Sequence, residues 1–154
     1  MANRMLAVIA VFLLAGPAVA EAQGTLTVRV LADVTGTFDL TAPATPHSGQ
    51  AFHVAGILCA DPTIEADCDS IGSFHCWGWI SASGIVVNQE YNFDGRGKIL
   101  VAGVEDGGPR AVVGGTGDFS NVRGEATGFV GLGEGEFPDP PEFVATFKLV
   151  GARN

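Results

Sequence analysis

The feature that most constrains the fold of this 154-residue chain is a series of short apolar runs without helical periodicity after the first 22 residues. Runs rich in Val, Ile, Phe, Thr and Trp alternate with Gly, Pro, Asn and Asp, as in antiparallel β proteins. Glycine occurs 22 times, about twice the usual ~7%, which favours tight hairpins. So many strands in one small domain predict a closed barrel or a sandwich, and closure removes exposed edges. The predicted strands are Leu26–Leu31, Thr35–Thr41, Ala51–Cys59, Ser73–Ser81, Ile85–Phe93, Lys98–Val104, Arg110–Val113, Gly124–Gly131 and Glu142–Val150.

The first residues have the organisation of a secretory signal peptide. Arg4 is followed by the apolar run "MLAVIAVFLLAG" and by the small residues Ala18 and Ala20 at a cleavage site. The apolar run is too short to span a bilayer. We therefore expect a leader over residues 1–22, a single domain over 23–154, and a secreted or periplasmic protein without a membrane anchor.

The charge of the expected mature chain restricts its partners. Cleavage after Ala20 removes Arg4 and leaves seven basic residues against seventeen acidic ones, a formal charge of −10, and cleavage after Ala22 also removes Glu21 and leaves −9. Such a field repels nucleic acid and anionic membranes and suits a neutral ligand. The sequence therefore predicts no nucleic-acid partner and no membrane partner.

Three cysteines in an exported chain predict a disulfide, although the sequence does not choose among the three pairings. Cys59 and Cys68 flank the turn-rich "ADPTIEAD", where a bridge would close a short loop. Cys76 is then left over, either buried in a strand or paired between chains. A zinc site of thiols with His53 or His75 is disfavoured, because His75 and Cys76 are adjacent in a strand and point to opposite faces. We predict no metal and no cofactor.

The period of two assigns faces to the strand Ile85–Phe93. One face is apolar and aromatic and carries Gln89, Tyr91 and Phe93. The other face is polar and carries Glu90. Because Glu90 and Tyr91 point in opposite directions, at most one of them faces a cavity.

Trp77 and Trp79 lie two residues apart and share one face of the strand Ser73–Ser81. They form an aromatic wall that would suit an apolar ligand. The simpler interpretation, which we favour, packs both indoles in a core or in a subunit interface. The candidate substrate-binding residues are Trp77, Trp79, Glu90, Tyr91 and Phe93.

The stretch "AVVGGTGDFSNVRGEATGF", residues 111–129, contains five glycines. A phosphate-binding loop would require a following helix and usually a lysine, and this stretch has neither. The alternating apolar residues after the loop continue as a strand. We expect a hairpin or bulge in which glycines adopt positive φ.

Within this stretch, "VVGGTGDFSNVRGEA", residues 112–126, resembles the glycine-rich signature of dirigent proteins and of their allene oxide cyclase relatives. Upstream, "NQEYNFDGRGKILVAG" resembles an aromatic strand, turn and strand of that family, and "ADPTI" resembles its acidic loop. The chain departs from the family pattern at Ala60 and Val122, and Gly103, Val104 and Glu105 stand where the family has Gly-Arg-Asn.

The resemblance implies an eight-stranded antiparallel barrel of calycin type, usually trimeric, with a cavity open at one end. The family's activities direct the cyclisation, isomerisation or stereoselective coupling of an apolar or phenolic substrate. Carried over residue by residue, it implies catalytic roles for Asp61, Asp118 and Arg123. Against these roles, Asp61 before Pro62 is also a common turn residue, and Asp118 and Arg123 would also pair across a hairpin.

Two functional hypotheses follow from the sequence. The first is an exported barrel that binds a small apolar or phenolic molecule and directs its reaction. The expected assembly of this barrel is a homodimer or a homotrimer. The second is a non-catalytic binding or structural barrel that keeps the fold signature without the chemistry. Ala60 and Val104, where polar residues of the family are missing, favour the second hypothesis.

Overall fold

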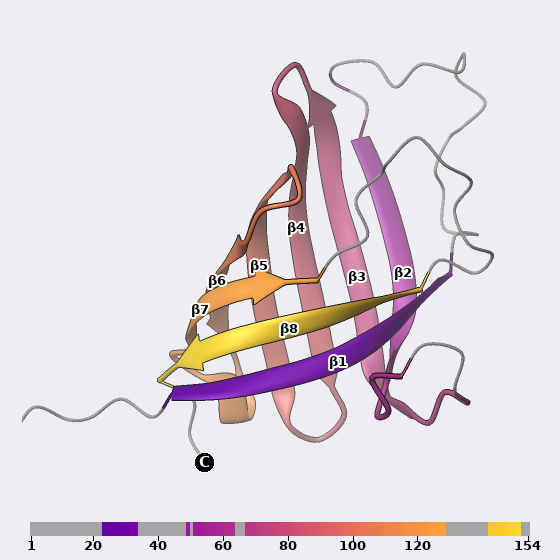
Figure 1. Ribbon diagram of the computed structural model, residues 1–154, viewed down its shortest axis with the longest axis vertical. Coiled ribbons are helices and arrows are strands. Elements are labelled where there is room, and N and C mark those ends of the chain that lie inside the picture. Colours follow the sequence, from indigo (N-terminus) through magenta and orange to yellow (C-terminus); the bar gives the residue numbers. More distant parts are fainter. Residues whose placement is uncertain (1–22, 34–48, 50, 64–66, 129–141, 152–154) are drawn as a thin grey trace, which may run out of the picture.

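The computed structural model describes residues 23–33, 49, 51–63, 67–128 and 142–151 of the chain (Figure 1). Within these residues the chain forms eight strands and a short 3-10 helix, η1. The elements are β1 (Gln23–Asp33), β2 (Ala51–Cys59), β3 (Ser70–Ser81), β4 (Gly84–Phe93), β5 (Gly97–Glu105), β6 (Arg110–Gly115), η1 (Gly117–Phe119), β7 (Arg123–Thr127) and β8 (Glu142–Val150). The described part of the chain contains no helix long and apolar enough to cross a bilayer.

The eight strands close into a barrel in which each strand is hydrogen-bonded to its sequence neighbours. Every pairing is antiparallel, and β1 completes the barrel by pairing with β8 along Gln23–Leu31. Figure 1 shows β1 and β8 crossing in front of the more upright β2, β3, β4 and β5. Because every strand has two partners, no edge is left open to pair with another chain.

The predicted strands agree with the observed ones in position. The ranges Ala51–Cys59 and Glu142–Val150 are confirmed without change, and most of the others differ only at their ends. The expected strand Thr35–Thr41 and the last residues of Gly124–Gly131 lie outside the described residues. The closed antiparallel barrel is confirmed, and the sandwich alternative is excluded.

The core fills the barrel with inward-facing side chains from alternate positions of the strands. An aromatic layer crosses it, in which the Tyr91 ring lies 5.0 Å from the Phe74 ring and 4.9 Å from the Phe147 ring, centroid to centroid. The buried hydrophobic residues of this core are Val28, Val30, Leu58, Phe74, Cys76, Val87, Tyr91, Phe93, Ile99, Val101, Val112, Phe119, Val122, Ala126, Ala145, Phe147 and Leu149.

The glycine-rich stretch is a hairpin, as predicted. It contains the end of β6, the 3-10 helix η1 and β7, which returns antiparallel to β6. Gly117 has a φ of +60°, and Gly124 has a φ of +145°. At Gly124 a Cβ atom would overlap the carbonyl oxygen of Lys148 on the neighbouring strand. These glycines therefore serve the backbone, and no nucleotide is needed to explain them.

The connection between β2 and β3 is closed by the predicted disulfide between Cys59 and Cys68, whose Cα atoms lie 5.0 Å apart. Thr63 and Asp67 of this connection lie against Arg29 on the outer face of β1. There Arg29 donates hydrogen bonds to the carbonyl oxygens of Thr63 at 2.7 Å and Asp67 at 3.2 Å. Cys76 is a buried free thiol. Of the two alternatives for Cys76, burial within a strand is therefore the one observed.

Candidate functional site

Five polar or ionisable side chains lie together inside the barrel, and we call them the interior cluster. They are Cys76 on β3, Gln89 and Tyr91 on β4, Glu105 on β5 and Arg110 on β6. Strand alternation turns each of them inward, and the register places Cys76 directly opposite Gln89. Cys76, Gln89, Tyr91 and Arg110 are buried, and Glu105 is partly buried.

Glu105 and Arg110 form an ion pair at the hairpin between β5 and β6. Arg110 Nη2 lies 3.0 Å from Glu105 Oε1, and the two side chains are 2% and 14% exposed. Burial raises the pKa of Glu105, and the positive charge of Arg110 opposes part of that rise. Burial also lowers the pKa of Arg110. The pair therefore places a carboxyl group with a raised affinity for a proton inside the barrel.

The other members of the cluster are neutral hydrogen-bonding groups. The Tyr91 hydroxyl donates to Gln89 Oε1 at 3.2 Å, and burial raises the pKa of Tyr91 well above 10.0. Burial likewise raises the pKa of Cys76 to about 12, while a hydrogen bond with Gln89 opposes this rise. The phenol and the thiol are consequently protonated at neutral pH, so Cys76 is a poor nucleophile here.

Glu105 and Arg110 lie at the barrel end formed by the β3–β4 and β5–β6 hairpins, which lie uppermost in Figure 1. Phe52 and Ile85 pack against the core there but remain half-buried. Ile85 is directly opposite Glu105 in the register of β4 and β5. Deeper in the barrel, Val87 and Tyr91 are fully buried. Glu105 is thus the member of the cluster nearest to this end.

Asp61 lies away from the interior cluster, in the disulfide-closed connection between β2 and β3. It is exposed, and its Oδ1 accepts a hydrogen bond from the backbone N–H of Thr63 at 2.8 Å. This bond lowers the pKa of Asp61. The geometry is that of a turn residue.

Asp118 and Arg123 are both exposed, and they take different partners. Asp118 Oδ2 lies 3.1 Å from Arg96 Nε, so its ion pair joins η1 to the β4–β5 turn. Arg123 donates to the carbonyl oxygen of Val122 at 2.6 Å. The structure therefore does not bring Asp118 and Arg123 into the cluster.

The five candidate substrate-binding residues divide between the two faces of the barrel wall. Tyr91 and Phe93 are buried inside. Glu90 lies on the outer face, where its Oε1 is 2.8 Å from Lys98 Nζ. Trp77 and Trp79 also lie outside and are 41% and 47% exposed, so neither indole belongs to the core.

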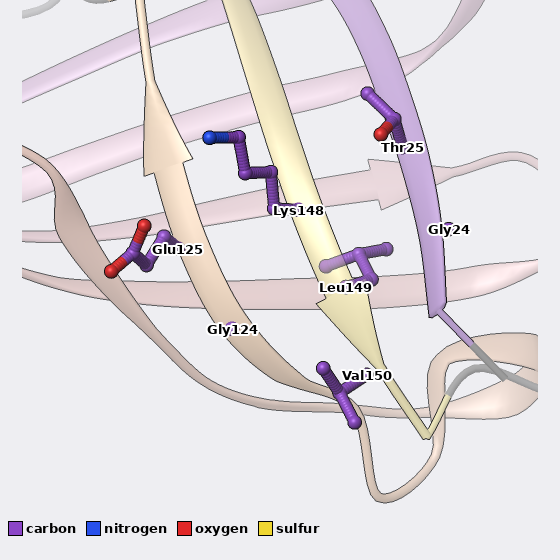
Figure 2. Close-up of a pocket in the computed structure, with 7 residues that line it drawn as sticks. All are labelled: Gly24, Thr25, Gly124, Glu125, Lys148, Leu149 and Val150. Atoms are coloured by element: carbon purple, nitrogen blue, oxygen red, sulfur yellow. The ribbon is translucent and has the colours of Figure 1, made fainter. Parts of the chain in front are cut away.

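A groove of about 410 Å³ lies across β1, β7 and β8, away from the interior cluster (Figure 2). Lys148 stands between Thr25 and Glu125, its direct neighbours on the two adjoining strands. The groove thus offers one ammonium group and one carboxylate to solvent. Its lining residues are Gly24, Thr25, Gly124, Glu125, Lys148, Leu149 and Val150. None of them was a candidate from the sequence.

Sequence analysis also missed Glu105 and Arg110 as site residues. The signal was present, because Gln89 interrupts an otherwise apolar strand face. Glu105 and Arg110 stand on either side of the short "DGGP" segment. If this segment is a hairpin turn, the inward-facing residues at the ends of its two strands lie close together. Their inward direction follows from register, which the sequence did not give for such short strands.

The chain matches no known protein-family profile and no curated protein sequence. Among solved structures it is similar to pyocyanin demethylase, with a TM-score of 0.56 and 22% sequence identity. The match covers 82% of this chain and 99% of that protein. At this identity the likeness concerns the barrel fold alone, and the fold is accordingly one that a small-molecule enzyme also uses.

Proposed function

We propose that this chain is an exported small-molecule-binding barrel that takes an apolar or phenolic ligand at the open end of the interior cluster. The observation that carries the proposal is the Glu105–Arg110 ion pair inside an otherwise apolar interior. An ion pair removed from water gives little net stability, and the charge of Arg110 also acts on the ionisable side chains of Tyr91 and Cys76. Ionisable groups whose pKa values are shifted by burial and by a charged partner cluster at binding and catalytic sites, which supports the proposal.

The cluster has the groups needed to direct a reaction of such a ligand. Glu105 retains its proton at a higher pH than an ordinary glutamate and would donate it to a ligand oxygen. Arg110 would hold a carbonyl or phenolate oxygen, and the apolar wall would restrict the ligand's conformers. Cyclisation, isomerisation or stereoselective coupling would then follow from positioning, as in the calycin-type dirigent and allene oxide cyclase barrels that the glycine signature resembles.

The likeness to pyocyanin demethylase supports the first part of this proposal. That protein is named for its action on pyocyanin, and its barrel is similar along most of this chain. A comparable barrel interior here would accept a small molecule of similar kind. Export is supported by the disulfide, since such bonds persist in oxidising compartments. A homodimer or homotrimer would cover the exposed Trp77 and Trp79.

The family resemblance gives catalytic roles to Asp61, Asp118 and Arg123. For these roles the three side chains would have to contact a ligand that is bound outside the interior cluster. Their exposed positions favour a second function, a binding or structural barrel without catalysis. In that case the interior cluster would fix ligand orientation only. The two functions differ in whether Glu105 transfers a proton.

Ligand binding to the full chain tests the proposal. We expect calorimetry with a panel of phenylpropanoids and oxylipins to find a ligand whose affinity falls at least tenfold in Tyr91→Phe and in Arg110→Lys. Glu125→Gln, on the outer face, is the matched control and should leave affinity unchanged. Asp61→Ala and Arg123→Ala report on the positions taken from the resemblance.

Binding that is insensitive to the cluster variants would contradict the proposed site, and the absence of binding by the folded protein would contradict the function. If a ligand binds, product analysis with Glu105→Gln separates the two functions. Loss of turnover with retained binding supports proton transfer by Glu105. Unchanged ligand after prolonged incubation with the wild type supports the non-catalytic barrel.

A further inference from the structure

We infer that His53 and His75 form a binding site for a divalent transition metal on the outer face of the barrel. His53 lies on β2 and His75 on β3. The register pairs His53 with Trp77 and His75 with Ala55, so the two imidazoles are diagonal neighbours on one face. The site is separate from the interior cluster, because Cys76, next to His75, points inward.

The spacing of the two ring nitrogens fits metal ligation. His75 Nδ1 and His53 Nε2 lie 3.4 Å apart. A tetrahedral zinc ion with Zn–N bonds of ~2.0–2.1 Å holds its ligand atoms about 3.3–3.4 Å from each other. The rings are within 25° of parallel, and His53 is exposed, so its ring has room to turn its lone pair toward a shared ion.

Metal binding here replaces the hydrogen bond between the two rings. One nitrogen now donates a proton to the other. If the donating histidine takes its other tautomer, its proton moves to the ring nitrogen that faces away from the pair. Both facing nitrogens then present lone pairs to the metal, and no proton is released to solvent. Imidazole ligands of this kind suit Zn²⁺, Ni²⁺ and Cu²⁺, with Cu²⁺ bound most tightly.

The surroundings favour a cation. The formal charge of the chain is −9, and Glu90, which stands directly opposite His75 on β4, is paired with Lys98. No group of three or more His, Cys, Asp or Glu side chains among the described residues is arranged to hold a metal. The site therefore has two protein ligands, with water in the remaining positions, and exchanges its metal readily, unlike a four-ligand structural zinc site.

Trp77 provides the readout, because it is directly opposite His53 and 41% exposed. Cu²⁺ titrated into the full chain should quench tryptophan fluorescence saturably, and Zn²⁺ should compete for the site without quenching. We expect His53→Gln and His75→Gln each to weaken Cu²⁺ affinity at least tenfold. His47→Gln removes a histidine that is not in the pair and should leave affinity unchanged. Trp77→Phe should lose most of the quenching but retain Cu²⁺ binding by equilibrium dialysis.

Circular dichroism of each variant checks that the barrel is folded. Equal Cu²⁺ affinity in the wild type and in both pair variants would assign the metal to other groups and overturn the site. The same conclusion follows if the folded wild type shows no saturable quenching up to millimolar Cu²⁺. A loss of affinity in His47→Gln equal to that in the pair variants would likewise overturn the assignment.

Discussion

Arg29 and Arg110 are buried equally, with side chains 2% exposed, and each pairs with one glutamate, yet they lie on opposite sides of the barrel wall. Arg29 Nη1 is 2.8 Å from Glu142 Oε1, and Arg110 Nη2 is 3.0 Å from Glu105 Oε1. Burial and pairing therefore do not distinguish the two. The groups around each guanidinium distinguish Arg29 from Arg110.

Besides Glu142, Arg29 contacts backbone carbonyl groups. Its neighbours in sequence, Val28 and Val30, face the core, so Arg29 points outward and is covered by the disulfide-closed connection. Its guanidinium donates to the carbonyl oxygens of Thr63 and Asp67. Carbonyl groups of this kind carry no exchangeable proton, so the contacts fix the loop on β1 and do no further chemistry.

Arg110 is surrounded by side chains. Its charge acts on the carboxyl of Glu105, the phenol of Tyr91 and the thiol of Cys76. Each of these groups can accept or lose a proton or bind a ligand atom. A buried charge therefore indicates a functional site only when its neighbours are side chains that can exchange a proton or bind a ligand atom.

Removing one partner of either pair should have the largest effect on stability. Arg29→Met and Arg110→Met each leave a largely buried carboxylate without its cation, which costs about 3–5 kcal/mol. The free energy of unfolding in urea measures this cost. A loss well below about 1 kcal/mol at either position would mean that solvent reaches the glutamate.

The double variants distinguish the two arginines. Glu105→Leu with Arg110→Met should recover most of the lost stability, because it removes both charges of the pair and leaves neither one buried alone. Glu142→Leu with Arg29→Met should remain less stable by about 2 kcal/mol, because the carbonyl oxygens of Thr63 and Asp67 lose their donors. An equal recovery of the free energy of unfolding in both double variants would mean that Arg29 and Arg110 do not differ in their contacts.

Loss of the disulfide should have the next largest effect. Cys59→Ser with Cys68→Ser releases a loop closed across nine residues of separation, which costs about 2–3 kcal/mol by loop entropy. Combined with Arg29→Met, the loss should be less than additive, since both changes free the same loop. Strict additivity in urea denaturation would show that Arg29 and the disulfide stabilise different parts of the barrel.

The sequence predicted the barrel well because alternation, glycine and turn residues act locally. The strand over residues 51–59 needed no knowledge of distant parts of the chain, whereas the choice of Cys59–Cys68 among three possible pairings came from the structure. The interior cluster was harder, because Glu105 and Arg110 are recognisable only when the register of the four strands β3 to β6 is known. Arg29 was missed for the same reason, since a loop 34 residues away in sequence covers it.

The Glu105 pair should also have a characteristic pH dependence. Burial holds the pKa of Glu105 above its ordinary 4.5, so the folded chain binds this proton more tightly than the unfolded chain does. The contribution is complete below pH ~4.5 and is lost as the pH rises through the raised pKa. The free energy of unfolding of the wild type relative to Glu105→Gln should therefore fall as the pH rises above about 4.5. A flat difference would place the pKa of Glu105 at its ordinary value.

The smallest effect is expected at Asp61, in the loop that covers Arg29, and its sign is opposite to that of Glu105. The Thr63 N–H holds the pKa of Asp61 below its ordinary 3.8, so the unfolded chain binds this proton more tightly than the folded chain does. Its contribution is present above pH ~3.8 and is lost as the pH falls through the lowered pKa. The stability of the wild type relative to Asp61→Asn should therefore decline between pH 5 and pH 2. An increase in this relative stability between pH 5 and pH 2 would mean that the charge of Asp61 opposes the fold. The loop over Arg29 would then be held by the guanidinium and the disulfide, and the Asp61 turn would not stabilise it.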